Sequence, residues 1–255
     1  MTNSKSAAAP RQIGISPEEW AVRVDLAAAY RLCAFNGWAD GTATHLSARV
    51  PGTDHFLINP FGLLFDEITA SSLIKVDMDG NALSQSEYEI NFAGYVIHSA
   101  ILAARADVAC VMHLHTDEGA AVSCLEEGLM PISQTAMLVC DQLAYHEWEG
   151  VAFELEERER LVEHLGDRNY MMLYNHGLLT SGKSIAEAYC RMWRFQRACC
   201  IQLMALSTGR PIKTFDPGAR ERTEEVGARI GSPHTHAEWA AFRRQLDRIS
   251  EDYQD

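Results

Sequence analysis

The sequence lacks the features that mark membrane-spanning and nucleic-acid-binding proteins. No apolar run approaches the ~20 residues of a membrane helix, and no basic-then-apolar leader is present at the N-terminus. Positive charge is scarce: 22 Lys and Arg face 35 Asp and Glu, for a net charge of -13. Such a chain has no general electrostatic reason to bind nucleic acid or an anionic membrane. We therefore expect a cytoplasmic protein whose partner is a small-molecule substrate.

Paired cysteines are also absent. The seven cysteines are an odd number, and none forms a C-x-x-C pair. Cys199 and Cys200 are adjacent, which is poor geometry for a mutual disulfide. The remaining five lie among apolar neighbours, as buried free thiols do: Cys33, Cys110, Cys124, Cys140 and Cys190. The pattern is typical of reduced cysteines in a cytosolic protein.

The length and local patterns predict one domain. A chain of 255 residues suits a single α/β domain with one large core. Residues 1–15 are small, polar and unpatterned, and we expect them to be disordered. Ser16-Pro17-Glu18-Glu19 then begins a helix, with Ser as the N-cap and Pro at the first helical position. The domain is expected to span residues 16–255 and to end in a helical tail.

Helical and strand patterns mix from one end of the chain to the other. Strands are predicted at residues 46–50, 56–58, 73–77, 108–115, 170–174 and 178–180, and further helices at 89–105, 117–124, 132–138, 154–165 and 184–208. Several connections are short hairpins, whereas a purely parallel sheet needs a crossover between each pair of strands. The sequence therefore predicts an α/β fold with a mixed, mostly antiparallel sheet covered by helices.

Three histidines form a candidate metal site. His113 and His115 lie two apart on a predicted strand, so both imidazoles project from the same face. His176 directly follows another apolar strand and precedes a Gly that allows close approach. A third imidazole there would complete one face of a coordination sphere.

Other interpretations of these histidines stay open at this point. Two strand histidines can show the H-x-H spacing without binding a metal. A histidine in the position of His176 is more often a hydrogen-bonded turn residue. A second pair, His234 and His236, sits at a predicted helix N-terminus. Side chains two residues apart on a helix point in directions that differ by about 200°, which is poor for chelation. We interpret that pair as solvated.

Five segments resemble the class II aldolase/adducin family. Residues 97–116, IHSAILAARADVACVMHLHT, resemble the family's helix and H-x-H strand. Residues 175–188, NHGLLTSGKSIAEA, resemble its third-histidine loop and the following helix. GWADGT at 37–42 with LSAR at 46–49 resembles the G-T-x-x-N-x-S-x-R loop, and INPFG at 58–62 resembles the I-T-P-T-G turn. The matches run in family order from about Leu26 to Leu206.

The resemblance implies fold, cofactor and assembly. It implies a three-layer α/β/α sandwich around a mostly antiparallel sheet, and a homotetramer with sites near subunit contacts. It also implies one divalent ion at His113, His115 and His176, with zinc the first choice and iron, manganese or cobalt as alternatives. Family members include sugar-phosphate aldolases, epimerases, dehydratases and decarboxylases. Adducin is a non-catalytic relative that has lost the metal ligands, which this chain keeps.

The chain departs from the aldolase pattern around the substrate. The family's metal-binding, proton-transferring Glu corresponds to Gly94, which can neither ligate nor move a proton. The phosphate-binding Asn corresponds to His45, and the Thr of the turn to Phe61. The two Ser residues that precede the Glu correspond to Phe92 and Ala93. Phosphate sites need hydrogen-bond donors, so these replacements point away from a sugar phosphate.

We therefore expect a pocket for an aromatic or otherwise apolar molecule that carries a carboxylate or carbonyl. The predicted substrate-binding residues are His45, Arg49, Phe61, Gly62 and Phe92. Alternatives remain for several of them. Arg49 could be a solvent-exposed strand residue, and Phe61 and Phe92 could simply pack in the core.

Three functions follow from these residues and the resemblance. The first is a metal-dependent lyase, of decarboxylase or aldolase type, with decarboxylation favoured because the Glu is missing. Its proton carrier would be His98, Tyr145, His146 or Glu147, although the last three also suit a surface loop. The second is a non-haem Fe(II) oxygenase of the class II aldolase-like type. The third is a non-catalytic, adducin-like binding protein, but a structural zinc usually has four protein ligands and the sequence offers three.

Overall fold

The computed structural model describes residues 14–150, 157–213, 215–216, 218–219, 222–223 and 232–255. Most of the segment predicted to be disordered, residues 1–13, lies outside these ranges, as do residues 151–156 at the start of the helix predicted at 154–165. No helix in the described ranges is both long enough and apolar enough to cross a membrane.

A seven-stranded sheet forms the middle of the molecule, in the order β3-β2-β1-β4-β7-β6-β5. All neighbours pair antiparallel except β5 and β6, which are parallel. The predicted mixed, mostly antiparallel sheet is therefore confirmed. The strands are β1 (His45–Arg49), β2 (Phe56–Ile58), β3 (Ile74–Val76), β4 (Cys110–Leu114), β5 (Leu143–His146), β6 (Tyr170–Leu173) and β7 (Gly177–Gly182).

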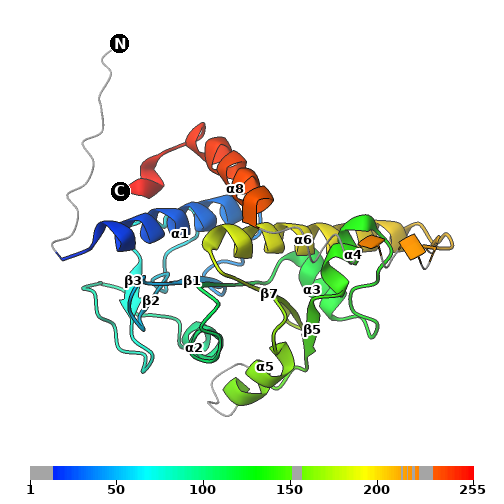
Figure 1. Ribbon diagram of the computed structural model, residues 1–255, viewed down its shortest axis with the longest axis horizontal. Coiled ribbons are helices and arrows are strands. Elements are labelled where there is room, and N and C mark those ends of the chain that lie inside the picture. The colour runs from blue at the N-terminus through cyan, green and yellow to red at the C-terminus, as the bar shows by residue number, and fades with distance from the viewer. Residues whose placement is uncertain (1–13, 151–156, 214, 217, 220–221, 224–231) are drawn as a thin grey trace.

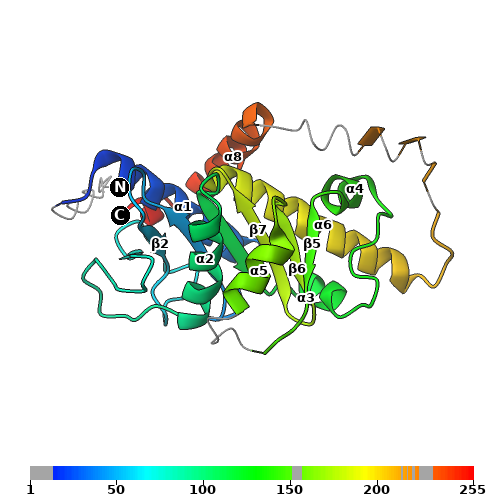
Figure 2. The same ribbon diagram turned by 60° about the horizontal axis from the view of Figure 1, so that its bottom comes forward.

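Helices cover both faces of the sheet, which completes the predicted three-layer α/β/α arrangement (Figures 1 and 2). One layer contains α1 (Pro17–Phe35), α6 (Ile185–Ser207) and α8 (Ser232–Asp247), and the other contains α2 (Phe92–Ala104) and α5 (Glu157–Leu165). The short helices α3 (Asp117–Ser123) and α4 (Gln134–Cys140) pack against α6, and the 3-10 turn η1 (Asp252–Gln254) packs against α1.

Side chains alternate between the two faces of the sheet along each strand, and they form a separate hydrophobic core on each face. In β4, the side chains of Cys110, Met112 and Leu114 enter the core under α1 and α6, whereas Val111 enters the core under α2 and α5. His113 has the parity of Val111, because successive side chains of a strand point to opposite faces. In β1, Leu46 and Ala48 likewise enter the α1/α6 core. His45 and Ser47 therefore share the α2 side of the sheet with His113.

Helix ends follow the local sequence signals. The Ser16 hydroxyl accepts a hydrogen bond from the Glu19 backbone N–H at 3.1 Å, and Pro17 is the first residue of α1, as predicted. Asn91 caps α2 in the same way, since its side-chain oxygen accepts from the Gly94 N–H at 3.3 Å. This cap places the first turn of α2 beside β1, where the site is built.

The structure differs from two of the expectations. The sequence pattern predicts no strand at Leu143–His146, but these residues form β5 at one edge of the sheet. Cys124 is exposed rather than buried, because it lies at the C-terminal end of α3. Asn175 lies in the short connection expected between the strands at 170–174 and 178–180, and it adopts a φ of 56° there.

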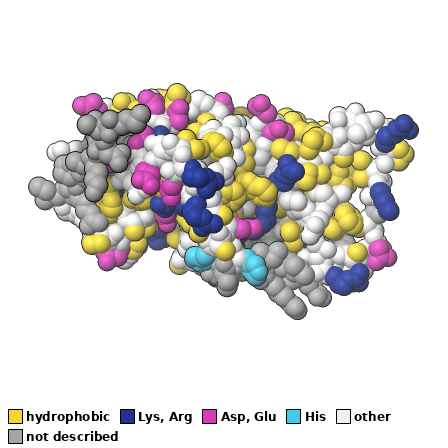
Figure 3. Space-filling model, turned by 90° about the horizontal axis from the view of Figure 1, so that it is seen from above, with side chains coloured by type: hydrophobic (Ala, Val, Ile, Leu, Met, Phe, Trp, Pro, Cys, Tyr) yellow, Lys and Arg dark blue, Asp and Glu magenta, His cyan; other side chains and the backbone are white. Residues whose placement is uncertain are grey.

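The face above α1, α6 and α8 has no continuous basic surface. Basic side chains are scattered there among hydrophobic and acidic ones, in the part of this face that the structure describes (Figure 3). This distribution agrees with the acidic composition, since non-specific nucleic-acid binding needs clustered Lys and Arg.

Candidate metal centre

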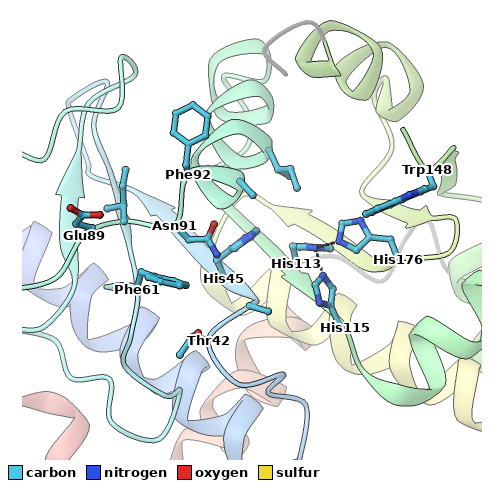
Figure 4. A pocket seen from close by; sticks show the side chains of 14 residues that line it. Thr42, His45, Phe61, Glu89, Asn91, Phe92, His113, His115, Trp148 and His176 are labelled. Carbon is cyan, nitrogen blue, oxygen red and sulfur yellow. Dashed lines mark hydrogen bonds between the residues drawn. The ribbon is translucent and has the colours of Figure 1, made fainter. Parts of the chain in front are cut away.

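The three predicted histidines converge at one end of the central strands (Figure 4). His113 lies in β4 and His115 follows its end, while His176 occupies the turn between β6 and β7. Because β4 pairs with β7, the turn before β7 is brought beside the end of β4. Gly177 makes this approach possible: a Cβ there would lie 2.5 Å from the Leu114 carbonyl oxygen, which is too close for any side chain.

The geometry fits a divalent cation. Nε2 of His113 lies 2.9 Å from Nε2 of His115 and 3.2 Å from Nε2 of His176. Nitrogens that each lie about 2.0–2.1 Å from one zinc ion are separated from each other by roughly 3 Å. Ligand atoms of all three residues lie within 4.8 Å of one another, and the described residues contain no fourth His, Cys, Asp or Glu in this group. The remaining coordination positions are therefore open to a substrate.

The outer nitrogens of two ligands are fixed by protein oxygens. Nδ1 of His115 lies 3.0 Å from the Asp40 carboxylate, and Nδ1 of His113 lies 3.1 Å from the Leu178 carbonyl oxygen. An acceptor at Nδ1 places the proton there and leaves Nε2 as a lone pair that faces the other imidazoles. Both contacts therefore orient the rings for metal binding.

Burial favours the neutral form of His113 and His176. It lowers the pKa of His113 well below its ordinary value, with the neighbouring His176 and His115 as further causes. Burial and the nearby His115 lower the pKa of His176 to about 4. Metal binding requires deprotonated imidazoles, so these two rings are in their ligating form at neutral pH.

A cavity of about 670 Å³ opens beside the three histidines. Phe61 and Phe92 lie on one side of it and Trp148 on the other, with His45 and the three histidines between them (Figure 4). The Trp148 ring packs edge-on against His176, with the centroids 5.0 Å apart. The residues that line the cavity are Thr42, Ala43, His45, Phe61, Glu89, Ile90, Asn91, Phe92, Ala93, Ile97, His113, His115, Trp148 and His176.

Three predicted substrate-binding residues lie at this cavity. Phe61 and Phe92 are each 48% exposed, so they are not core residues and their rings present apolar surface to a ligand. His45 is only 2% exposed but contributes to the wall. Gly62, with a φ of 106°, forms the turn that follows Phe61 and does not itself line the cavity.

Arg49 lies elsewhere, and the expectation that it contacts a substrate anion is not supported. Its guanidinium donates to the backbone carbonyls of Leu102, at 2.5 Å, and Val108, at 3.4 Å. Both oxygens lie beyond the cavity, near the C-terminal end of α2. Arg49 therefore holds the end of α2 and the following loop against β1.

The four predicted proton carriers do not line the cavity of their own chain. His98 is fully buried behind His45. The Tyr145 hydroxyl accepts a hydrogen bond from the Leu129 N–H at 3.2 Å, and burial raises the pKa of this tyrosine to about 12. His146 is buried, with Nδ1 lying 2.8 Å from Nδ1 of His164, and Glu147 is exposed just after β5.

Sequence reasoning missed several residues of the site. Asp40 and Trp148 contact the metal ligands, but each sits in a loop far from them in the sequence. Glu89 and Asn91 line the cavity from the segment that precedes α2. Asp40 belongs to the GWADGT motif, which is the one signal that could have drawn attention to it.

Sequence comparison identifies relatives along nearly the whole chain. Residues 24–203 match the model of the Class II Aldolase and Adducin N-terminal domain. A Caulobacter vibrioides protein, provisionally named an aldolase class 2 protein, is 50% identical over 244 residues, covering 94% of this chain and 95% of the relative. Mouse alpha-adducin is 38% identical over 244 residues, which are 89% of this chain but only 33% of alpha-adducin.

Solved structures give the same result. The crystal structure of an aldolase II superfamily protein from Pseudomonas syringae has a TM-score of 0.92 and 50% identity, covering 95% of this chain and 98% of that one. An L-fuculose 1-phosphate aldolase from Glaciozyma antarctica has a TM-score of 0.83 and 26% identity, with coverage of 97% and 98%. The matched sequence model, these relatives and the shared architecture lead to one conclusion: the chain belongs to the class II aldolase and adducin family.

Proposed function

We propose that the protein is a metal-dependent carbon–carbon lyase that acts on a non-phosphorylated, aromatic or otherwise apolar hydroxy or keto carboxylate. The observation that carries this proposal is an open three-histidine site beside a cavity with aromatic walls. Three protein ligands leave room for a substrate, whereas structural zinc sites are usually closed by four.

The metal would be held by His113, His115 and His176. When bound, a divalent ion there supplies Lewis-acid stabilisation of a developing enolate oxygen. Asp40 and the Leu178 carbonyl orient two of the ligands. Zinc is our first choice, because three imidazoles at this spacing suit it, although imidazole also suits iron and cobalt.

The cavity walls support the proposed substrate class. Phe61, Phe92 and Trp148 present aromatic surface on two sides of the triad. None of these side chains offers the several hydroxyl or amide donors that bind a phosphate group. An aromatic ring held between them would place its carboxylate or carbonyl near the histidines.

Decarboxylation suits this site better than aldol cleavage. Gly94 stands where sugar-phosphate aldolases have a proton-transferring Glu, and a glycine moves no proton. Among the predicted carriers, His98 reaches the cavity only through its contact with His45. Tyr145, His146 and Glu147 lie outside the cavity of their own chain, so we assign them no role within it.

The experiment that tests this proposal has three steps. Protein purified without added metal is analysed for bound ions, reloaded with Zn²⁺, Mn²⁺ or Co²⁺, and incubated anaerobically with aromatic hydroxy and keto acids. Release of CO2 or of a cleaved carbonyl product by the loaded wild type, but not by His115→Ala, supports the lyase. A loaded wild type that cleaves none of these acids contradicts it.

The adducin relatives favour a second candidate, a binding protein without catalysis. Mouse alpha-adducin shares 38% identity with this chain, so the fold alone does not imply chemistry. Failure of the histidine site to bind any divalent ion would select this alternative. Bound iron together with O2 uptake on aromatic keto acids would instead select a non-haem oxygenase.

A further inference from the structure

The ring of His45 occupies the space that a side chain of residue 94 would need. A Cβ on residue 94 would lie 2.6 Å from Cδ2 and 3.0 Å from Nε2 of the His45 ring, closer than real side chains approach. The His45 ring also packs against His113, with the ring centroids 5.2 Å apart. The ring therefore keeps its position only because residue 94 has no side chain.

A line of hydrogen bonds runs from the interior of the protein to this ring. The Ser47 hydroxyl lies 2.5 Å from Nδ1 of His98, and Nε2 of His98 lies 2.8 Å from Nδ1 of His45. Ser47 and His98 are fully buried and His45 almost so. Both rings are buried away from carboxylates, which favours neutral imidazoles, and their 2.8 Å contact needs one donor nitrogen and one acceptor nitrogen.

The serine sets the direction of this line. Within the described ranges, the Ser47 hydroxyl has no hydrogen-bond partner other than His98. If His98 donated to Ser47, the hydroxyl proton would be buried without an acceptor, which is unfavourable. Ser47 therefore donates to Nδ1 of His98, and Nε2–H of His98 donates to Nδ1 of His45. The remaining proton of His45 must then lie on Nε2.

We infer that His45 presents a permanently oriented Nε2–H donor to the cavity, and that this donor binds an anionic oxygen of the substrate beside the three histidines. His45 lines the cavity, and within the described residues its Nε2 makes no hydrogen bond to protein. Ser47 and His98 are positioning residues, and the bare Cα of Gly94 provides the space. The inference deepens the proposed function and rests on it for the identity of the anion.

The direction of the line has a consequence for specificity. A fixed donor stabilises a carboxylate or oxyanion and repels a ligand group that is itself only a donor, such as an ammonium. A side chain at position 94 would remove the donor by displacing the ring. The ring of His45 fills the space that a side chain of residue 94 would need. Position 94 can therefore hold no carboxylate while the imidazole keeps this place.

Nitrogen NMR tests the direction without any substrate. Long-range proton–nitrogen spectra of zinc-loaded protein with labelled histidine distinguish the two tautomers of each ring. We expect His45 and His98 both to carry the proton on Nε2. Ser47→Ala should convert His45 to a mixture of tautomers. The control Ser99→Ala removes an equally buried hydroxyl of α2 that bonds to the Tyr95 carbonyl instead, and it should leave both rings unchanged. A proton on Nδ1 of His45 in the wild type would overturn the inference.

Binding of phenylpyruvate to zinc-loaded protein, measured by calorimetry, tests the role of the donor. His45→Phe keeps a ring but loses the N–H, and Gly94→Ala crowds the ring. Each should weaken binding about tenfold or more, since a hydrogen bond to a charged group is lost, while zinc content stays at the wild-type level. If both variants bound phenylpyruvate with the affinity of the wild type, the donor role of His45 would be refuted. Failure of loaded wild type to bind phenylpyruvate would count against the proposed substrate class, while the tautomers would still decide the inference.

Discussion

The Asp40 carboxylate lies 3.0 Å from Nδ1 of His115, a contact that joins residues 75 positions apart in the sequence. It ties the loop before β1 to the end of β4. Because a carboxylate at Nδ1 fixes the tautomer and increases the basicity of Nε2, this residue should contribute to metal affinity without touching the ion.

Asp40→Asn should weaken zinc binding by about 10- to 100-fold, the usual effect of losing such a partner. Competition with a chromogenic chelator measures the change. Asp54→Asn removes an exposed acid from the turn between β1 and β2 and serves as the charge-matched control. Equal losses in the two variants would mean that Asp40 acts only through net charge.

His115→Ala should abolish stoichiometric metal loading. Two remaining imidazoles chelate a divalent ion far more weakly than three, and His115 also carries the contact with Asp40. Metal content after dialysis, measured by elemental analysis, gives the result. His234→Ala, which changes an exposed histidine of the rival H-x-H pair in α8, should retain full loading. Full metal content in His115→Ala would show that the ligands have been wrongly assigned.

Trp148 should report metal binding by its fluorescence. Its ring centroid lies 5.0 Å from that of His176, so Co²⁺ at the site should quench its emission strongly. Trp148→Phe should therefore lose most of the Co²⁺-dependent quenching but still bind the ion. The matched control is Trp193→Phe, which alters a partly exposed tryptophan on α6 that packs against Phe242. Quenching that survives Trp148→Phe but disappears in Trp193→Phe would place the ion elsewhere.

Stability should decline in mild acid, and His98 should be one cause among the buried histidines. Burial lowers the pKa of this histidine from 6.5 to about 3. Between these values the unfolded chain binds a proton that the folded chain does not, so the free energy of unfolding rises with pH. The contribution is complete above about pH 6.5 and is lost as the pH falls towards 3.

Urea unfolding of metal-free protein at several pH values between about 7 and 4 measures this slope. The control is His98→Gln, which keeps a hydrogen-bonding side chain but does not titrate in this range. Its free energy of unfolding should depend less on pH than that of the wild type. Identical slopes would show that His98 takes up its proton equally easily in the folded and unfolded states.

Much of the fold was predictable from local signals. The cap at Ser16, the strand at Phe56–Ile58 and the H-x-H strand follow from short-range patterns, and each forms as expected. The edge strand β5 was not predicted, since Leu143–His146 is short and pairs in parallel with a strand that is distant in the sequence. Its stability comes from tertiary pairing, which a local pattern does not encode.

The site was predictable only in part, for a similar reason. His113, His115 and His176 follow from spacing and from the family resemblance, and the structure brings them together. The contacts of Asp40 and Trp148 with these ligands depend on how loops cross the strand ends. The contacts of Arg49 were equally hidden from the sequence: its guanidinium donates to the backbone carbonyls of Leu102 and Val108, outside the cavity lining.

The aromatic walls and the metal ligands come from different parts of the sheet. Two of the ligands belong to β4 or follow it directly, and the third precedes β7, at the centre of the sheet. Phe61 follows β2, near one margin, and Trp148 follows β5, at the other. On the proposed function, substitutions at the margins would change which molecules are admitted while the three histidines stay in place. Substrate range could then evolve independently of reactivity.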